Sequence, residues 1–389
     1  MYKIDLITSA RSDFTLWLPV YRAIRSDKRF SCRFIVTGTH FLSSLGNTYK
    51  EVHKEIPIED RYDIPIGDKD NLEACLSTIL NQYYLELLKG NTDLVFILGD
   101  RFELLPVMTA AVINRVPMAQ LFGGECDVSY CIDTQIRNSI TKASHIFFVT
   151  HNDIKQRMVA MGEEEWRICV SGNSSDHIKP QRDKSIYDFL KSIGINIGMK
   201  EVVNCCYHPP TIRPNIWQRE LPEIFAALEE FPDFFYIWTG VNADPEGNSV
   251  REFIKSTVKE KSNHVFVDHL GGNLYRSLLS NARLMVGNSS SGLLEAPIYQ
   301  IPVINVGSRQ AGRLHGPGVI DCAGNKASIS SAIIYSMKMS RVNIINVFAQ
   351  PNFPYNISEH LYCCLQNPDL MIKRLTGVQN TLQRVPEYE

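Results

Sequence analysis

Leu94-Val95-Phe96-Ile97-Leu98-Gly99-Asp100-Arg101 is the stretch that decides the fold class, because an apolar run ends at glycine and is followed at once by charged residues. The pattern recurs at Met118-Ala119-Gln120-Leu121-Phe122, which leads into Gly123-Gly124-Glu125. Continuous apolar strands that alternate with helical runs predict a parallel sheet covered on both faces. Ligands of such a sheet bind beyond the carboxyl ends of its strands. We therefore expect one rim of the sheet to carry Asp100, Arg101, Glu125 and Asp133.

The same alternation of strand and helix runs through the rest of the chain and predicts two domains. A length of 389 residues is too great for one ordinary hydrophobic core. The polar, proline-broken segment Lys179–Lys184 marks the expected crossing. We predict an α/β protein of two Rossmann-like doubly wound domains, residues 1–179 and residues 180–389. The return of the last helix to the first domain is an open alternative.

Composition gives no reason to expect nucleic acid or a membrane as a partner. Lys+Arg total 40 and Asp+Glu total 42, and no apolar run approaches the roughly 20 residues that a membrane helix needs. The N-terminus also lacks the apolar core of a signal sequence. The ten cysteines contain no CxxC motif, so we expect buried, reduced thiols in a cytoplasmic protein. No metal site is predicted, because the sequence contains no HExxH motif and no cluster of histidines.

Two further residues at strand ends are candidates for the first rim. The strand Tyr2–Ile7 is followed by a turn and Arg11, where a nucleotide-binding fold places phosphate, although no GxGxxG motif is present. A positive charge is mildly unfavourable at a helix start, which favours phosphate binding by Arg11 over a surface role. His40 follows the strand Arg33–Val36 at the same rim, and a structural and a functional role are equally open for it.

The second half of the chain contains the best candidate anion site. At Asn288-Ser289-Ser290-Ser291-Gly292 a strand ends, small residues turn and a helix begins. Free backbone N–H groups, hydroxyls and the helix dipole favour phosphate there, whereas capping alone would need one serine. Glu295, expected inside the same helix, is placed to accept ribose hydroxyls or to offset the dipole. The cations expected opposite this turn are Arg309 and Arg313.

His208 and Asn242 complete this second set of candidates. His208 directly follows a strand and precedes two prolines, which stop the ladder and leave the imidazole at the rim. Asn242 lies at the end of the next strand. One domain thus offers groups for a nucleotide diphosphate, and the other presents acids. Carboxylates in a cleft can serve as general acid and base when their pKa values are pushed apart.

Taken together, these residues resemble the motifs of the hydrolysing UDP-N-acetylglucosamine 2-epimerases of sialic-acid, legionaminic-acid and related nonulosonic-acid synthesis. The resemblance covers almost the whole chain, and the ordered set of motifs is specific where each motif alone is weak. The motifs are Thr8-x-x-Arg11-x-Asp13-Phe14, Val36-Thr37-Gly38-x-His40, Gly99-Asp100-Arg101, Gly123-Gly124-Glu125, Asp133-x-x-Ile136-Arg137-x-x-Ile140-Thr141-Lys142, His208-Pro209-x-Thr211, Gly287-Asn288-Ser289-Ser290-Ser291-Gly292-x-x-Glu295 and Arg309-Gln310-x-Gly312-Arg313.

The resemblance implies two domains facing a cleft, as in the GT-B glycosyltransferases, with no cofactor and a homodimer or homotetramer. It implies elimination of UDP across C1–C2 of a UDP-sugar to a glycal-like intermediate. Water then adds and gives the free 2-epimeric sugar, typically N-acetylmannosamine. The implied catalytic acids are Asp100, Glu125 and Asp133, with Arg101 and Arg137 beside them. The other candidate substrate contacts are Arg11, His40, His208, Asn242, Ser289, Ser290, Ser291, Glu295, Arg309 and Arg313.

Three positions depart from the family motifs. Many relatives have a histidine at the position of Gln120, an ionisable residue at that of Phe122, and a histidine at that of Asn138. These changes cluster around the sugar half of the site, while the phosphate half is intact. We therefore expect UDP binding to be retained and the sugar to differ. A 6-deoxy diacetamido sugar of the bacillosamine type would suit Phe122 better than a sugar with a 6-hydroxyl.

Four alternatives remain open. A non-hydrolysing epimerase would release a UDP-sugar, and a retaining glycosyltransferase on the same fold would transfer the sugar to an acceptor. A UDP-sugar-binding protein without catalysis would fit the changes at Gln120, Phe122 and Asn138. A purely structural nucleotide-binding module is disfavoured by three separate acids at strand ends.

Overall fold

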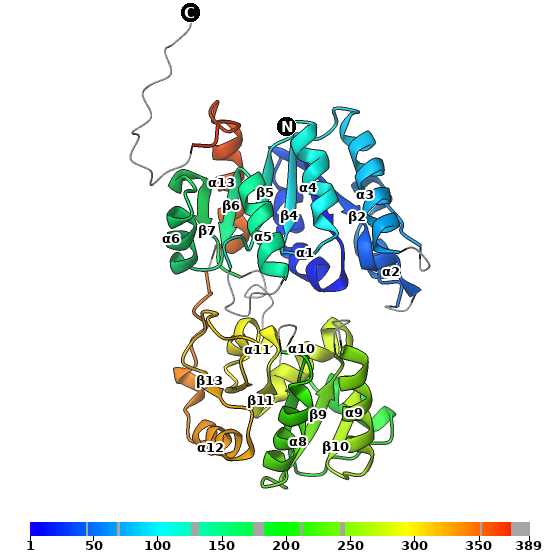
Figure 1. Cartoon of the computed structure of the whole chain (residues 1–389), viewed down its shortest axis with the longest axis vertical. Coiled ribbons are helices and arrows are strands. Elements are labelled where there is room, and N and C mark those ends of the chain that lie inside the picture. The colour runs from blue at the N-terminus through cyan, green and yellow to red at the C-terminus, as the bar shows by residue number, and fades with distance from the viewer. Residues whose placement is uncertain are drawn as a thin grey trace, which may run out of the picture. The chain divides into compact units, whose positions relative to one another are not determined.

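The computed structural model describes residues 1–43, 46–67, 71–125, 132–173, 183–210, 213–241, 246–350 and 352–374. The chain forms two compact units, each built on its own sheet (Figure 1). The first unit contains the described residues up to 125, residues 132–173 and those from 350 onward, and the second contains residues 183–349. The expected boundary at residue 179 falls outside the described residues.

The first unit is a parallel sheet with helices on both faces. Within its described part the strand order is β3-β2-β1-β4-β5-β6-β7. The strands are β1 (Tyr2–Thr8), β2 (Phe30–Val36), β3 (Arg61–Asp63), β4 (Leu94–Leu98), β5 (Met118–Leu121), β6 (Ile146–Val149) and β7 (Ile168–Val170). The helices are α1 (Arg11–Ser26), α2 (Tyr49–Glu55), α3 (Leu72–Leu87), α4 (Leu104–Ile113), α5 (Ile132–Ala143), α6 (Asn152–Ala160) and α13 (Phe353–Leu365), and the short 3-10 turns are Gly38–Phe41, Ile58–Asp60 and Glu165–Arg167.

Apolar residues on alternate sides of these strands explain the two helical layers. One set packs with α1 and α13, and the other packs with α3, α4 and α5 (Figure 1). Because both faces are covered, the central strands β4, β5 and β6 are buried along their whole length. The last helix, α13, belongs to this first unit although it is far away in sequence.

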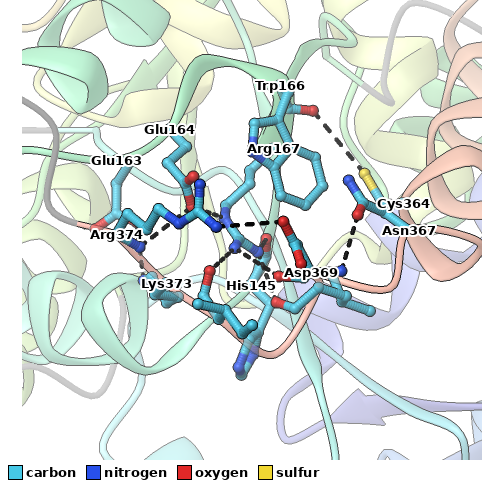
Figure 2. A network of polar contacts seen from close by, with 12 residues as sticks. His145, Glu163, Glu164, Trp166, Arg167, Cys364, Asn367, Asp369, Lys373 and Arg374 are labelled. Atoms are coloured by element: carbon cyan, nitrogen blue, oxygen red, sulfur yellow. Dashed lines mark hydrogen bonds and ion pairs between the residues drawn. The ribbon is translucent and has the colours of Figure 1, made fainter. Parts of the chain in front are cut away.

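The segment after α13 is tied down by the fully buried side chain of Arg167 (Figure 2). Its Nη1 donates to the carbonyl of Leu370 at 2.8 Å, its Nη2 to that of Ile372 at 2.6 Å, and its Nε to Oε2 of Glu164 at 2.7 Å. A buried guanidinium is tolerated when its donors are satisfied in this way. Lys373 then donates to the carbonyl of Lys142 at 3.0 Å, at the C-terminal end of α5.

The second unit repeats the architecture. Its described part has the strand order β10-β9-β8-β11-β12-β13. The strands are β8 (Glu201–Cys206), β9 (Phe234–Thr239), β10 (His264–Val267), β11 (Leu284–Gly287), β12 (Val303–Val306) and β13 (Val319–Cys322). The helices are α7 (Ser185–Ser192), α8 (Trp217–Leu228), α9 (Gly247–Lys259), α10 (Gly271–Asn281), α11 (Ser290–Leu294) and α12 (Lys326–Met337), with 3-10 turns at Ala296–Tyr299 and Arg341–Asn343. Helices α8, α9 and α12 pack on one face, and α7, α10 and α11 on the other.

The strand order reverses once in each sheet, between β1 and β4 and between β8 and β11. At such a switch point the connections leave toward opposite faces, and a crevice opens at the carboxyl ends of the strands. The prediction of two doubly wound α/β domains is confirmed. The sequence analysis missed two edge strands, β3 and β13, because each includes a charged residue and neither forms a continuous apolar run.

Candidate functional site

The candidate residues of the first unit gather at the carboxyl ends of β1, β4 and β5. The turn after β1 is closed by Asp13, whose carboxylate accepts hydrogen bonds from the N–H groups of Ser9 and Ala10, both at 2.9 Å. Burial raises the pKa of Asp13, and these hydrogen bonds oppose the shift. Arg11 begins α1 directly after this turn, and burial lowers its pKa while the charge of Glu51 partly restores it. The turn is therefore rigid and presents a half-buried guanidinium.

His40 supports this turn from behind. The side chain is fully buried, with Nε2 2.9 Å from the hydroxyl of Thr8 and Nδ1 2.9 Å from that of Thr48. Burial, with a smaller effect from the charge of Arg101, lowers the pKa of His40 to about 4. The ring is thus neutral at pH 7, and both nitrogens already contact threonine hydroxyls, so a nitrogen could contact a substrate directly only by giving up one of these contacts.

Arg137 contacts the side chain of one predicted acid and the backbone of another. Its side chain is 5% exposed, Nη2 forms an ion pair with Oδ2 of Asp100, and Nη1 donates to the backbone carbonyl of Glu125 at 2.7 Å. The carboxylate of Glu125 accepts a hydrogen bond from the hydroxyl of Thr150. Asp133 is exposed in the first turn of α5, the helix that carries Arg137. Arg137 therefore pairs with the side chain of Asp100 and with the backbone of Glu125, whose carboxylate is held separately by Thr150.

Arg101 is held by a residue that the sequence analysis missed. Nε of Arg101 lies 3.2 Å from Oε2 of Glu103, and Nη2 lies 2.8 Å from Oε1. Burial lowers the pKa of Arg101, but the charge of Glu103 together with Asp13 and Asp133 raises it above its ordinary value. The sequence did contain a signal for this pair. Glu103 comes two residues after Arg101, so both side chains emerge from one turn and can pair with each other.

In the second unit, Asn288 joins the ends of β8 and β11. Its Oδ1 accepts from the N–H of His208 at 2.7 Å, and its Nδ2 donates to the carbonyl of His208 at 2.8 Å. The carbonyl of Asn288 accepts from Nη1 of Arg309 at 3.1 Å and from Nε2 of Gln310 at 2.8 Å. A side chain at Gly287 would collide with the carbonyl of Cys206, which explains the glycine before this junction.

His208 lies within this junction as a neutral group. The residue is buried, and burial together with the charge of Arg309 lowers the pKa of the imidazole to about 3. Its Nε2 lies 3.5 Å from the thiol of Cys206. At pH 7 this histidine can therefore exchange hydrogen bonds with a ligand but carries no charge, so positive charge at this junction comes from Arg309.

The serine turn is shorter in structure than the sequence analysis expected. Ser289 caps α11 by accepting from the N–H of Ser291 at 3.4 Å, and Ser290 is the first helical residue. The hydroxyl of Ser291 lies 2.5 Å from that of Tyr275, a contact that the sequence analysis missed. The expectation that Glu295 lies inside this helix is wrong, because α11 ends at Leu294 and Glu295 is its C-cap. Burial raises the pKa of Glu295, and a hydrogen bond from Ser291 opposes this.

Two of the predicted contacts have other outcomes. Arg313 follows Gln310 in a turn, and its backbone N–H donates to the carbonyl of Gln310 at 3.1 Å. The side chain of Gln310 contacts Asn288, so Arg313 comes three residues after a residue of the Asn288 junction. Asn242 lies outside the described residues.

Among the described residues there is no cluster of three or more His, Cys, Asp or Glu suited to a metal. Within the same part of the chain, no helix combines the length and apolar character required to cross a bilayer.

Comparison with known proteins gives consistent results. A family model described as UDP-N-acetylglucosamine 2-epimerase matches residues 22–357. The GDP/UDP-N,N'-diacetylbacillosamine 2-epimerase (hydrolyzing) of Campylobacter jejuni is 33% identical over 82% of this chain and 84% of its own length. The UDP-N,N'-diacetylbacillosamine 2-epimerase (hydrolyzing) of Legionella pneumophila is 28% identical over 89% of this chain and 92% of its own length.

A solved structure shares the fold. The UDP-GlcNAc 2-epimerase of Neisseria meningitidis bound to UDP-GlcNAc superposes with a TM-score of 0.75 at 17% identity, covering 93% of this chain and 100% of that structure. The family model covers most of the chain, and the Campylobacter jejuni enzyme is 33% identical over 82% of it. These matches show a shared family and not only a shared fold. The chain therefore belongs to the UDP-N-acetylglucosamine 2-epimerase family of enzymes.

Proposed function

We propose that this enzyme is a hydrolysing 2-epimerase that converts a UDP-linked N-acetylated hexosamine into UDP and the free 2-epimeric sugar. The observation that carries the proposal is that Arg137 forms an ion pair with Asp100 and donates to the backbone carbonyl of Glu125 at the carboxyl ends of β4 and β5. This contact places ionisable groups where a doubly wound sheet binds its ligand. Names of relatives support the hydrolysing branch of the family.

The reaction needs a base and an acid. A base removes the C2 proton while the C1–O bond breaks and its electron pair leaves with UDP, which gives a glycal. Water then adds its oxygen to C1, and a proton is delivered to C2 from the opposite face. Asp100, which forms an ion pair with Arg137 directly after β4, is assigned as the base. Glu125 and Asp133 are then the candidates for proton delivery and for activation of water.

The nucleotide is assigned to the second unit. Arg309 and Arg313 provide positive charge, and Ser289, Ser290 and Ser291 provide hydroxyl and backbone donors at the start of α11. Neutral His208 offers a hydrogen bond, and Glu295 is assigned to ribose hydroxyls, with Asn242 as a further contact. In the first unit, Arg11 and Arg101 are assigned to the phosphates and the sugar, and His40 to support of the Thr8 turn.

The preferred sugar is proposed to be a diacetamido-6-deoxy hexose. Both named relatives act on N,N'-diacetylbacillosamine linked to a nucleotide, and this supports the proposal. Phe122 is half-buried and packs against the core of the first unit, so the exposed part of its ring is what a sugar could meet. The preference is thus supported more strongly by the relatives than by Phe122.

One experiment tests reaction and sugar together. The purified enzyme is incubated in deuterated water with UDP-N-acetylglucosamine or with the UDP-diacetamido-6-deoxy sugar, while UDP release and deuterium at C2 are followed. We expect free 2-epimeric sugar with deuterium at C2 and faster turnover of the diacetamido sugar. Faster turnover of UDP-N-acetylglucosamine would overturn the sugar assignment. A UDP-sugar product would instead identify a non-hydrolysing epimerase, and tight UDP binding without turnover would identify a binding protein.

The assembly and location of the enzyme stay predictions. A homodimer or homotetramer is expected from the family resemblance, and light scattering at micromolar concentration measures it. A cytoplasmic location is likewise proposed, because nucleotide-sugars are the substrates assigned here.

A further inference from the structure

Gln120 is a polar side chain in the centre of the first sheet. It lies in β5, between Ile97 of β4 and Phe147 of β6, and it is fully buried. A buried amide costs free energy unless its donors and acceptor are hydrogen-bonded. An apolar residue would be the ordinary occupant of a central strand in a sheet covered on both faces. The contacts of this amide therefore require an explanation.

Both ends of the Gln120 amide contact helix α5. Nε2 donates to the backbone carbonyl of Arg137 at 3.3 Å, and Oε1 accepts from the hydroxyl of Thr141 at 2.7 Å. The same hydroxyl lies 2.9 Å from the carbonyl of Arg137. The amide thus binds one turn of α5 at two points, which restricts both sliding and rotation of the helix relative to β5.

Gln120 also contacts the turn that leads to Glu125. A methyl group placed on Gly123 would lie 2.6 Å from Oε1 of Gln120, so this position of the turn lies directly against the amide. One side chain therefore lies between the turn that carries Glu125 and the helix that carries Arg137. The guanidinium of that arginine in turn contacts Asp100 and the carbonyl of Glu125.

We propose that Gln120 is a positioning residue for the acid cluster. It sets the place of α5 and of the Gly123 turn, and through Arg137 it sets the orientation of the Asp100 side chain and the position of the Glu125 backbone. Gln120 does not touch the substrate in this proposal, which rests on the proposed epimerase function. Since displacement of a catalytic group by about 1 Å can cost about 100-fold in rate, loss of the amide is expected to lower kcat more than it raises KM.

The decisive variant is Gln120→Glu. A protonated carboxyl reproduces both contacts, because its O–H donates to the carbonyl of Arg137 and its C=O accepts from Thr141. An ionised carboxylate has no donor and faces the carbonyl of Arg137, which it repels. Burial raises the pKa of a carboxyl group above its usual value of about 4.3. Relative to the unsubstituted enzyme, the variant should be most active at low pH and lose kcat as the pH rises.

The experiment compares Gln120→Glu and Gln120→Leu with Gln156→Glu, which makes the same chemical change at an exposed position of α6. Between about pH 5.5 and about pH 8.5, the ratio of kcat in Gln120→Glu to kcat in the unsubstituted enzyme should fall at least about tenfold. KM for the UDP-sugar and Kd for UDP should change less than about threefold. Gln120→Leu should show the low kcat at every pH, and Gln156→Glu should follow the unsubstituted enzyme. A pH-independent kcat ratio for Gln120→Glu would overturn the proposal.

A second measurement does not depend on turnover. Amide hydrogen exchange of α5, followed by mass spectrometry, should be faster in Gln120→Leu, and in Gln120→Glu at high pH, than in the unsubstituted protein at the same pH. Unchanged exchange in α5 would overturn the positioning role even if the protein released no UDP. Absence of UDP release from the unsubstituted protein, together with faster exchange in the variants, would refute the epimerase function but retain the contact between Gln120 and α5.

Discussion

The two candidate clusters are held together by different kinds of contact. In the first unit, cations pair with carboxylates, as Arg137 does with Asp100 and Arg101 does with Glu103. In the second unit, the junction is built from amide and backbone contacts, with Asn288 bonded to both ends of the His208 peptide unit. Proton transfer requires carboxylates in defined protonation states, and neighbouring charge sets those states. Binding a diphosphate requires cations and N–H donors, and the second unit has Arg309 and the start of α11 beside the Asn288 junction.

The largest expected effect comes from the acid cluster. Asp100→Asn keeps the shape of the side chain but removes the carboxylate that is proposed to act as the base. We expect UDP release to fall by about 1,000-fold or more, while Kd for UDP stays within about an order of magnitude. Steady-state kinetics and calorimetry measure the two quantities. Asp153→Asn, at an exposed position of α6, is the matched control, and full activity of Asp100→Asn would refute the assigned role.

The amide junction should show the opposite pattern. Asn288→Ala leaves the buried N–H and carbonyl of His208 without their partner, at a cost of about 1–3 kcal/mol for each group. We expect Kd for UDP to rise roughly 10- to 100-fold with a smaller change in kcat at saturation. Asn248→Ala, at an exposed position of α9, should leave both unchanged. A lower kcat with unaltered UDP affinity would show that the Asn288 junction does not serve nucleotide binding as proposed.

Each cluster contains a buried histidine, and His40 makes the first unit sensitive to acid. Its pKa is about 4 when folded, against about 6.5 in an unfolded chain, so between these values the unfolded state binds more protons. Stability is therefore lost as the pH falls, by about 2 kcal/mol at pH 5 relative to pH 7 from this residue. Urea unfolding at both values should show a loss about 2 kcal/mol smaller in His40→Gln. Exposed His269→Gln serves as control, and an unchanged pH dependence in His40→Gln would contradict the account.

The smallest expected effect concerns Glu103. Glu103→Gln keeps one hydrogen-bond acceptor for Arg101 but removes the opposite charge that orients it. We expect kcat/KM for the UDP-sugar to fall about tenfold, which corresponds to about 1.4 kcal/mol, with Kd for free UDP unaltered. Steady-state kinetics measure this, with Glu73→Gln in the first turn of α3 as the exposed control. An equal loss of affinity for free UDP would place Arg101 on the nucleotide rather than on the sugar.

Much of the fold and half of the site could be predicted from local sequence. Apolar runs that end at glycine predicted β4 and β5, and chain direction then placed Asp100 and Glu125 at the same edge. Similar reasoning predicted β8 and β11 and the serine turn between strand and helix. The length of α11 was mispredicted, because Ser290–Leu294 continues as a 3-10 turn that local pattern does not distinguish from a helix.

Residues that hold the site in place could not be predicted in the same way. Asn288 bonds a residue 80 positions away, and Gln120 bonds residues 17 and 21 positions away. In the sequence, Gln120 was a departure from the family motif, whereas in the structure it lies between the acid turn and α5. Its neighbours depend on which helix covers β5, and strand periodicity does not specify that.

The sequence by itself determined the two doubly wound sheets and the acids and cations at their rims, because strand periodicity and strand direction are local properties. Only the tertiary structure decided which charges pair, that His40 and His208 are neutral, and that α13 returns to the first unit. Pairing and burial depend on side chains brought together from distant parts of the chain. The pKa of each buried group follows from that packing and from the charges that face it.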